Sequence, residues 1–145
     1  MKASSKILID RTLIAQLAGM FWPPILVFCL HVFLSRGLHL YSLVPWIDIP
    51  MHLLGGLSMA YSLFLVLAFL QDSGVISRLD RIIEWVLVFT LVATIALFWE
   101  FSEFSFDHLF RSNVQISLPN TMQDLFMGML GASTMIGYKI IKKPL

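Results

Sequence analysis

Charged residues are scarce in this chain. They make up 13% of its 145 residues, whereas 58% are hydrophobic. Soluble domains normally contain about 25% charged residues, so this composition excludes an ordinary water-soluble fold and indicates an integral membrane protein. The length is that of one domain, and we expect a single integral membrane domain over residues 1–145.

Other familiar signals are absent as well. The chain has one cysteine, Cys29, which excludes an internal disulfide. Its net charge of +1 gives no reason to expect a nucleic-acid partner. No nucleophile elbow, H-E-x-x-H, C-x-x-C or P-loop motif occurs. The sequence therefore carries none of the common catalytic signatures.

Long apolar runs dominate what is present. A helix needs about 20 apolar residues to cross a bilayer, and four windows meet this requirement, at residues 13–35, 51–70, 84–105 and 121–140. The predicted fold class is therefore all-α, a polytopic bundle of four transmembrane helices. The first run is too long for the apolar region of a signal peptide and lacks a small-residue cleavage site after it, so we expect it to be retained. Pro23 and Pro24, near its middle, should kink it.

Basic residues are distributed unevenly between the two ends of these spans. The outer end receives only Arg36 and Arg111. The other end receives eight of the ten basic residues, which are Lys2, Lys6, Arg11, Arg78, Arg81, Lys139, Lys142 and Lys143. The positive-inside rule then puts both termini in the cytoplasm. We expect a bacterial cytoplasmic (inner) membrane, with the opposite end facing the periplasm or exterior.

Acidic residues gather at the outer ends of the spans. The third span ends with three carboxylates spaced i, i+3 and i+7, which places them on one helix face. An aspartate and a histidine spaced i, i+4 begin the second span, and another aspartate begins the fourth. Carboxylates so close together require compensation by protons, cations or hydrogen-bond donors, and oxygen and imidazole ligands suit Mg²⁺, Mn²⁺ or Zn²⁺. The predicted ligands of a divalent metal cation are Asp48, His52, Glu100, Glu103, Asp107 and Asp124.

Structural roles compete with this interpretation. Asp124 follows Thr121 by three residues, which is the spacing of a helix capping box. Asp48 has the residue type of a helix cap. Glu103 and Asp107 are tolerated at a membrane interface as solvated carboxylates. These roles remain open alternatives to metal binding.

Glu100 and the histidines differ in how easily a structural role explains them. Glu100 sits between two aromatic residues with an apolar run behind it, so a functional role is favoured. His31 is internal to the first span, where it could bridge two helices, join the acidic cluster or be a satisfied polar residue. His39 and His108 are typical of loop histidines.

Further polar and aromatic residues near the outer boundary could complete a pocket. Arg36 and Arg111 either bind a phosphate or neutralise the carboxylates. Trp46, Tyr41 and Trp99 have the positions of interfacial anchors.

Small residues predict how two of the spans approach each other. Aligning His52 with Asp124 also aligns Gly56 with Gly128, four residues further on in each span. Small residues at this spacing allow close packing of helix backbones. We therefore expect the polar ends of the second and fourth spans to meet.

Three stretches together resemble a known family. They are D-I-P-x-H-x-x-G-G at residues 48–56, W-E-x-x-E-x-x-x-D at residues 99–107 and N-T-x-x-D-x-x-x-G-x-x-G-A at residues 120–132. Over about residues 45–135 the chain is similar to the YjdF-like and VanZ-like small integral membrane proteins. The resemblance implies a helical membrane fold with polar positions at the six predicted ligands, and it supplies no reaction. Asn120 stands where the resemblance leads us to expect an acidic residue in many relatives, so the ligand count is not fixed.

These observations favour a metal-dependent lipid hydrolase or transferase, acting on a lipid or lipid-linked phosphorylated substrate at the outer leaflet. Glu100 and Glu103 are the candidate catalytic residues, with Glu100 as general base. Arg36, Arg111 and Asn120 are the candidate substrate-binding residues. The alternatives are a non-catalytic binder of a cation, lipid headgroup or envelope precursor, and a proton- or ion-coupled transport subunit. The expected partners are the lipid bilayer and a lipid-linked small molecule, and a homodimer that completes the site stays open.

Overall fold

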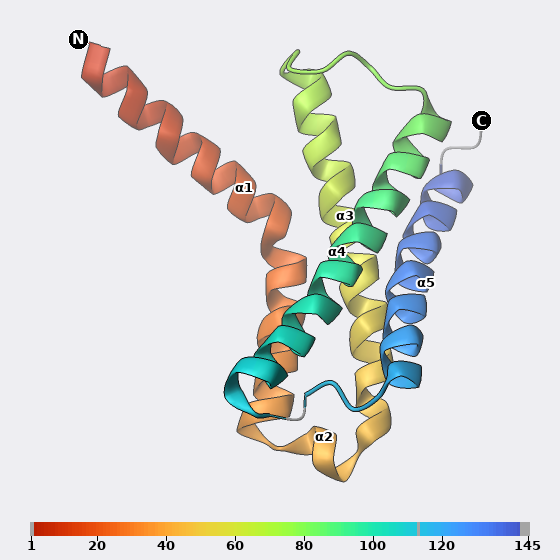
Figure 1. Ribbon diagram of the computed structural model, residues 1–145. Helices are drawn as coiled ribbons and strands as arrows, with labels where there is room; N and C mark the ends of the chain where they lie inside the picture. The colour runs from red at the N-terminus through yellow and green to blue at the C-terminus, as the bar shows by residue number, and fades with distance from the viewer. Residues whose placement is uncertain (1, 113, 143–145) are drawn as a thin grey trace.

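The protein is a bundle of long helices, described here from a computed structural model that covers residues 2–112 and 114–142, with side chains from Ile14 onward. The long helices are α1 (Lys2–Val32), α3 (Asp48–Asp72), α4 (Arg81–Phe110) and α5 (Leu118–Lys142). Between α1 and α3 lie a π-helical segment (Phe33–Gly37), the short helix α2 (Leu40–Leu43) and a 3₁₀ turn (Pro45–Ile47). Figure 1 shows α2 at one end of the bundle and both termini at the other, which we call the α2 end and the terminal end.

Three of the long helices have the length and apolar composition of membrane spans. Among the described residues these segments are Ile14–Gly37, Pro45–Asp72 and Arg81–Phe110. The prediction of an all-α membrane protein is confirmed to this extent. The helix α5 is 25 residues long but less apolar than the other three. Lys143, which contributed to the predicted orientation, lies outside the described residues, as do the side chains of Lys2, Lys6 and Arg11.

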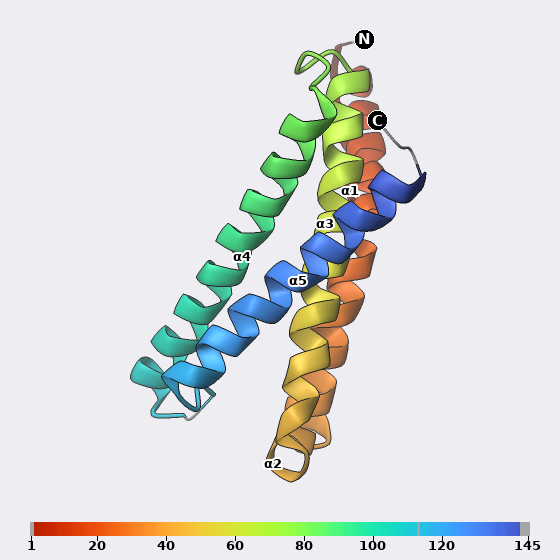
Figure 2. The same ribbon diagram turned by 90° about the vertical axis from the view of Figure 1, so that its right-hand side faces the viewer.

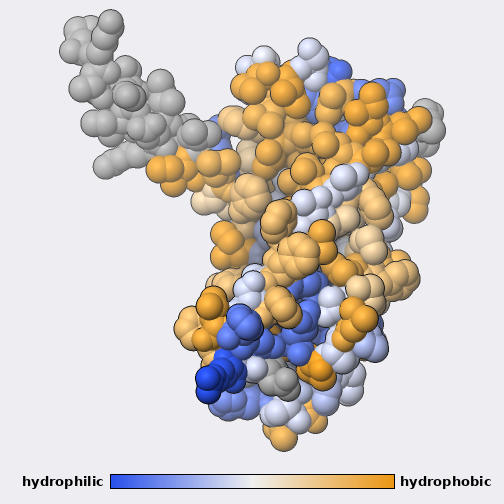
Figure 3. All heavy atoms as spheres, viewed as in Figure 1, coloured by the Kyte–Doolittle hydropathy of each residue, from blue (hydrophilic) through white to orange (hydrophobic). Residues whose placement is uncertain are grey.

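The outer surface of the bundle is apolar. Trp22, Phe98 and Phe101 are all more than half exposed. Figure 3 shows hydrophobic residues over most of the visible face and hydrophilic residues toward both ends, most extensively toward the α2 end. Such a surface would be unfavourable in water and is suited to the hydrocarbon of a bilayer.

The core lies between α3, α4 and α5, in the half of the bundle away from α2. Phe64 and Leu67 of α3 pack there with Val88 and Val92 of α4 and with Met135 of α5. The helix α5 crosses α3 at an angle (Figure 2), and these two helices form the most extensive contact in the bundle. The contact fixes how the start of α5 lies against the start of α3.

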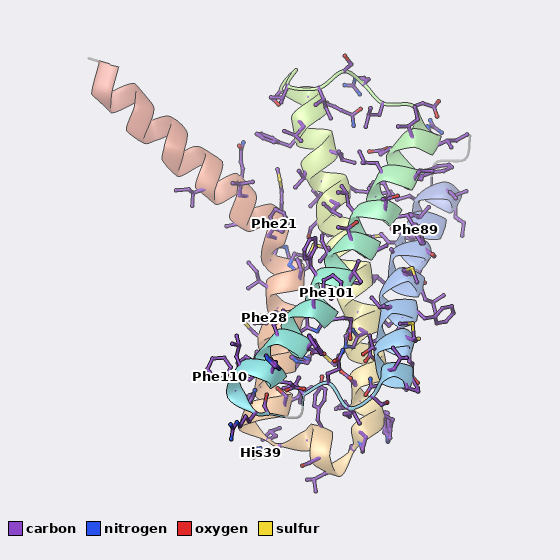
Figure 4. The ribbon with its side chains drawn as sticks, viewed as in Figure 1. Phe21, Phe28, His39, Phe89, Phe101 and Phe110 are labelled. Carbon is purple, nitrogen blue, oxygen red and sulfur yellow. The ribbon has the colours of Figure 1, made fainter. Side chains whose placement is uncertain are left out.

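Two prolines lie inside α1. Pro23 and Pro24 have no N–H, so the carbonyl groups of Gly19 and Met20 lack their usual helical donors. Figure 1 shows α1 bent, and Phe21, labelled in Figure 4, lies beside the bend. The predicted kink is therefore present. It directs the first part of α1 away from α4.

Candidate functional site

Three side chains that commonly bind metals meet at the α2 end. Asp48 lies in the first turn of α3 with His52 one turn later, and Nε2 of His52 is 3.3 Å from Oδ1 of Asp48. Oδ1 of Asp124, on α5, is 3.9 Å from the same nitrogen. One ligand atom from each residue lies within 4.8 Å of the others. Ligands held at about 2.1 Å by a tetrahedral ion are about 3.4 Å apart, so this group, the His/Asp/Asp group, could hold a metal ion.

Glycines bring the two aspartates together. A Cβ added to Gly56 of α3 would overlap the backbone of Gly128 on α5. The two backbones are therefore in contact one turn from His52 and one turn from Asp124. The prediction that small residues draw the polar ends of these helices together is confirmed.

Glu100 approaches the group from α4. The residue is 3% exposed, and no described group donates a hydrogen bond to either carboxylate oxygen. Its electrostatic partners include His52, Asp124 and Asp48, and the Thr121 hydroxyl lies beside it without forming a hydrogen bond of normal geometry. Leaving a buried carboxylate without a donor is costly. A bound cation or proton would compensate that cost.

Asp124 belongs to this group and lies inside α5, not at the start of the helix. The helix α5 begins at Leu118, and the hydroxyl of Ser117 accepts a hydrogen bond of 3.4 Å from the backbone N–H of Asn120. The capping-box interpretation of Asp124 is wrong, because Thr121 already lies inside the helix. The side-chain amide of Asn120 instead donates to Oδ2 of Asp124, while Oδ1 has no hydrogen-bond partner among the described residues.

A second polar network lies next to the group, on the α1 side. Trp99 donates its indole N–H to Glu103 at 2.9 Å and packs edge-on against His31, with ring centroids 5.6 Å apart. A hydrogen bond of 2.8 Å joins the Tyr41 hydroxyl to Nδ1 of His31. Burial, reinforced by the nearby charge of Asp48, raises the pKa of Tyr41 and keeps its hydroxyl protonated. The network assigns His31 to helix–helix hydrogen bonding.

Asp107 organises the loop after α4. Its carboxylate accepts hydrogen bonds from the hydroxyl of Ser112 at 2.5 Å and from the backbone N–H groups of Val114 at 2.7 Å and Gln115 at 2.8 Å. The side chain of Gln115 donates to Oγ1 of Thr121 at 2.9 Å, which links the loop to α5. The structure does not bring Asp107 into the His/Asp/Asp group.

We expect Asp107→Ala to loosen this loop and to leave the His/Asp/Asp group in place. Hydrogen bonds to a charged acceptor contribute about 1.5–3 kcal/mol, so the amides of Val114 and Gln115 should exchange with solvent deuterium about tenfold or more faster. Hydrogen–deuterium exchange in detergent measures this change. The amide of Ile82, which donates to Asp80 at the other end of α4, is the internal control. Unchanged exchange at both loop amides would contradict the role of Asp107.

The predicted substrate-binding arginines lie at the rim. The Arg36 guanidinium stacks over the ring of Phe106, 5.5 Å from its centroid, and Arg111 follows α4 in a left-handed backbone conformation with φ of 52°. Both arginines are exposed, as are His39 and His108. Figure 4 labels His39 at the α2 end, beyond the helices that carry the His/Asp/Asp group.

The family of the chain follows from a match that covers nearly its whole length. Residues 7–143 match a family described as "Predicted membrane protein (DUF2238)". The chain belongs to the DUF2238 family. Family membership and the apolar helices together place the protein in a membrane. Comparison with curated proteins and with solved structures gave no match.

Three of the six predicted ligands form the His/Asp/Asp group, and Glu100 and Glu103 lie close enough to interact electrostatically with His52 and Asp48. The sequence pattern does not reveal the contacts of Tyr41 and Trp99 with His31, because the short helix α2 is what returns Tyr41 to α1. The one available signal is the i, i+4 spacing of Trp99 and Glu103, which permits their hydrogen bond.

Proposed function

We propose that this DUF2238 protein is a divalent-metal-dependent membrane enzyme, a hydrolase or transferase, that acts on a lipid or lipid-linked phosphorylated substrate. The observation that carries the proposal is that both carboxylate oxygens of Glu100, and Oδ1 of Asp124 within the His/Asp/Asp group, are buried and receive no hydrogen bond from any described residue. Proteins leave few buried polar atoms unsatisfied, and ionisable residues within membrane segments commonly mark function. A divalent cation such as Mg²⁺, Mn²⁺ or Zn²⁺ would satisfy Oδ1 of Asp124 and would compensate the nearby charge of Glu100.

The residues divide into ligands and a base. Asp48, His52 and Asp124 would hold the ion, whose chemistry is to polarise a phosphoryl or acyl oxygen of the substrate. Glu100 lies beside them with both oxygens able to accept a proton from an attacking water, which is the role of a general base. Glu103 is the second candidate for this role, although it already accepts an indole N–H hydrogen bond.

The proposed substrate contacts lie at the rim. Arg36 and Arg111 are exposed at the α2 end, where guanidinium groups could form paired hydrogen bonds with a phosphate. Asn120 orients Asp124 with one amide hydrogen. Its second amide hydrogen is the donor proposed for the substrate.

The proposed location is a bacterial cytoplasmic membrane, with the site at the outer leaflet. The start of α1 and the end of α5 both lie at the terminal end (Figure 1), where most basic residues of the sequence also fall. The positive-inside rule then favours a cytoplasmic terminal end. With 25 residues, α5 is about 38 Å long and reaches the length of a fourth span.

The finer relationship to YjdF-like and VanZ-like proteins is part of this proposal, and the motif positions that form the site support it. Non-catalytic binding of a cation, headgroup or envelope precursor would use the same residues. Ion-coupled transport has less support, because a path from the site to the terminal end would cross the apolar core around Phe64, Val88 and Val92. A homodimer that completes the site is a further proposal.

The test separates metal binding from turnover. Wild-type protein purified without chelator should hold close to one divalent ion per chain by mass spectrometry, and should convert one of a set of phosphorylated or acylated lipids. Glu100→Gln should retain the ion and lose about 100-fold or more of that turnover, the usual contribution of a general base. Glu84→Gln, at the terminal end of α4, is the matched control and should retain both properties.

Two results would change the proposal. Folded wild-type protein that takes up none of Mg²⁺, Mn²⁺, Ca²⁺ or Zn²⁺ would overturn the metal centre. Stoichiometric metal without turnover of any lipid in the set would instead support the non-catalytic binder.

A further inference from the structure

A cavity of about 350 Å³ lies between α1, α3 and α4. Its walls include Phe21, Ile25 and Phe28 of α1 and Val92 and Ile95 of α4. Figure 4 labels Phe21 and Phe28 along α1. The volume lies within the range of about 300–1,000 Å³ that is typical of pockets for small molecules.

The cavity is apolar along its length and polar at one end. Its ionisable lining residues among the described residues are His31 and His52, and its remaining polar group is the indole of Trp99. His52 belongs to the His/Asp/Asp group, so the cavity ends at the candidate metal site. A pocket with an apolar body and one polar end fits an amphiphile whose polar group lies at that end.

The cavity is open on the outer surface of the bundle. Ile25 and Phe28 line it and yet are 54% and 50% exposed. Near the site, α1 meets α4 through Trp99, whose ring lies 5.9 Å from Phe28 and 5.6 Å from His31. Toward the terminal end the bent α1 diverges from α4 (Figure 1). The opening therefore lies between two membrane-spanning helices and faces the bilayer.

We propose that this cavity holds one hydrocarbon chain of a phosphate-bearing lipid whose headgroup reaches the His/Asp/Asp group. The inference rests on the proposed function and specifies its substrate class. A hydrocarbon chain that enters the cavity sideways from the bilayer moves from one apolar environment into another, so its entry has little solvation cost. The headgroup gains contacts with the cation and with the rim arginines, which fixes the orientation of the lipid.

Gly55 determines how much of the cavity is open beside α3. It lines the cavity, and a Cβ added to it would meet no atom within 4 Å. A larger side chain at this position would therefore enter the cavity without displacing a helix. Gly137 of α5 also has no neighbour within 4 Å of an added Cβ, and it does not line the cavity. Gly55→Leu and Gly137→Leu are thus a matched pair.

The experiment uses the full chain in phosphatidylcholine vesicles that contain a phosphatidic acid with a diazirine on one acyl chain. After illumination, mass spectrometry locates labelled residues. In wild type we expect labelling of Met59, Val92 and Ile95 in the cavity, and of Ile83 on the exposed face of α4 as the reference for surrounding lipid. Gly55→Leu should reduce the cavity labelling relative to Ile83 by about tenfold or more, which corresponds to a loss of about 1.4 kcal/mol in binding. Gly137→Leu should give the same ratio of cavity labelling to Ile83 labelling as wild type.

The metal content of the same samples separates this inference from the proposed function. Cavity labelling that is absent in wild type, or unchanged in Gly55→Leu, overturns the inference even if the ion is bound. Crosslinks between copies at cavity residues would also overturn it, because a second chain would then be the occupant. Loss of the cavity labelling in Gly55→Leu supports the inference. If the same protein contains no metal, the lipid cavity stands and only the metal centre is refuted.

Discussion

Gly56→Ala is expected to destabilise the bundle by about 3 kcal/mol, despite the higher helix propensity of alanine. The added methyl group would overlap the backbone carbonyl of Gly128, and a backbone carbonyl cannot move away as a side chain can. The helices α3 and α5 must then separate, and this contact is the most extensive in the bundle. Unfolding in mixed detergent micelles, followed by circular dichroism, would measure the change.

Gly55→Ala is the control for that measurement. It makes the same chemical change one residue earlier in the same helix, where the new methyl group meets nothing within 4 Å. Its stability should equal or exceed that of wild type, because alanine favours the helix. If the two variants had equal stability, close packing of Gly56 on Gly128 would not be what holds the α2 end together.

Asp124→Asn is expected to abolish metal binding while leaving the fold intact. The amide has nearly the shape of the carboxylate and can still hydrogen-bond with Asn120, but it removes the charge that faces His52. Loss of groups that only support a ligand weakens metal affinity about 10- to 100-fold, so loss of the ligand itself should cost at least on the order of 100-fold. Metal content by mass spectrometry, with circular dichroism for folding, would show the result.

Asp107→Ala controls for the general loss of a carboxylate at the α2 end. Its oxygens already accept hydrogen bonds from the loop, so this variant should retain the ion. A wild-type metal content in Asp124→Asn would exclude the His/Asp/Asp group as the binding site. Loss of metal in both variants would indicate that the loop, and not Asp124 alone, determines binding.

Local pattern predicts most of the helices correctly. The predicted spans from residue 51 onward lie inside α3, α4 and α5, and each helix continues for a further two to five residues at either end. Hydropathy and length report whether a segment can be a membrane helix, and they do not report where polar residues extend it. For this reason Asp107 lies within α4, and Thr121 lies inside α5 and not at its cap.

The candidate site was predictable only in part. The i, i+4 pair of Asp48 and His52 is a property of one helix, and their contact follows from helical geometry once α3 begins at Asp48. The approach of Asp124 follows from the matched glycines of two helices. The different surroundings of Glu100 and Asp107 could not be predicted, because the two residues share a helix face. Glu100 lies opposite residues of α3 and α5, whereas Asp107 lies opposite the loop after α4.

Composition and apolar runs were enough to predict a membrane protein built from helices, and spacing along single helices identified the candidate metal ligands. These properties depend on composition and on spacing along one helix, which are local. Helix packing brings three of the predicted ligands together with Glu100, places Asp107 where it holds a loop, and leaves an apolar cavity open between the bent α1 and the site. The physical reason is that these features depend on how helices cross and where loops return, and neither is encoded in the periodicity of a single segment.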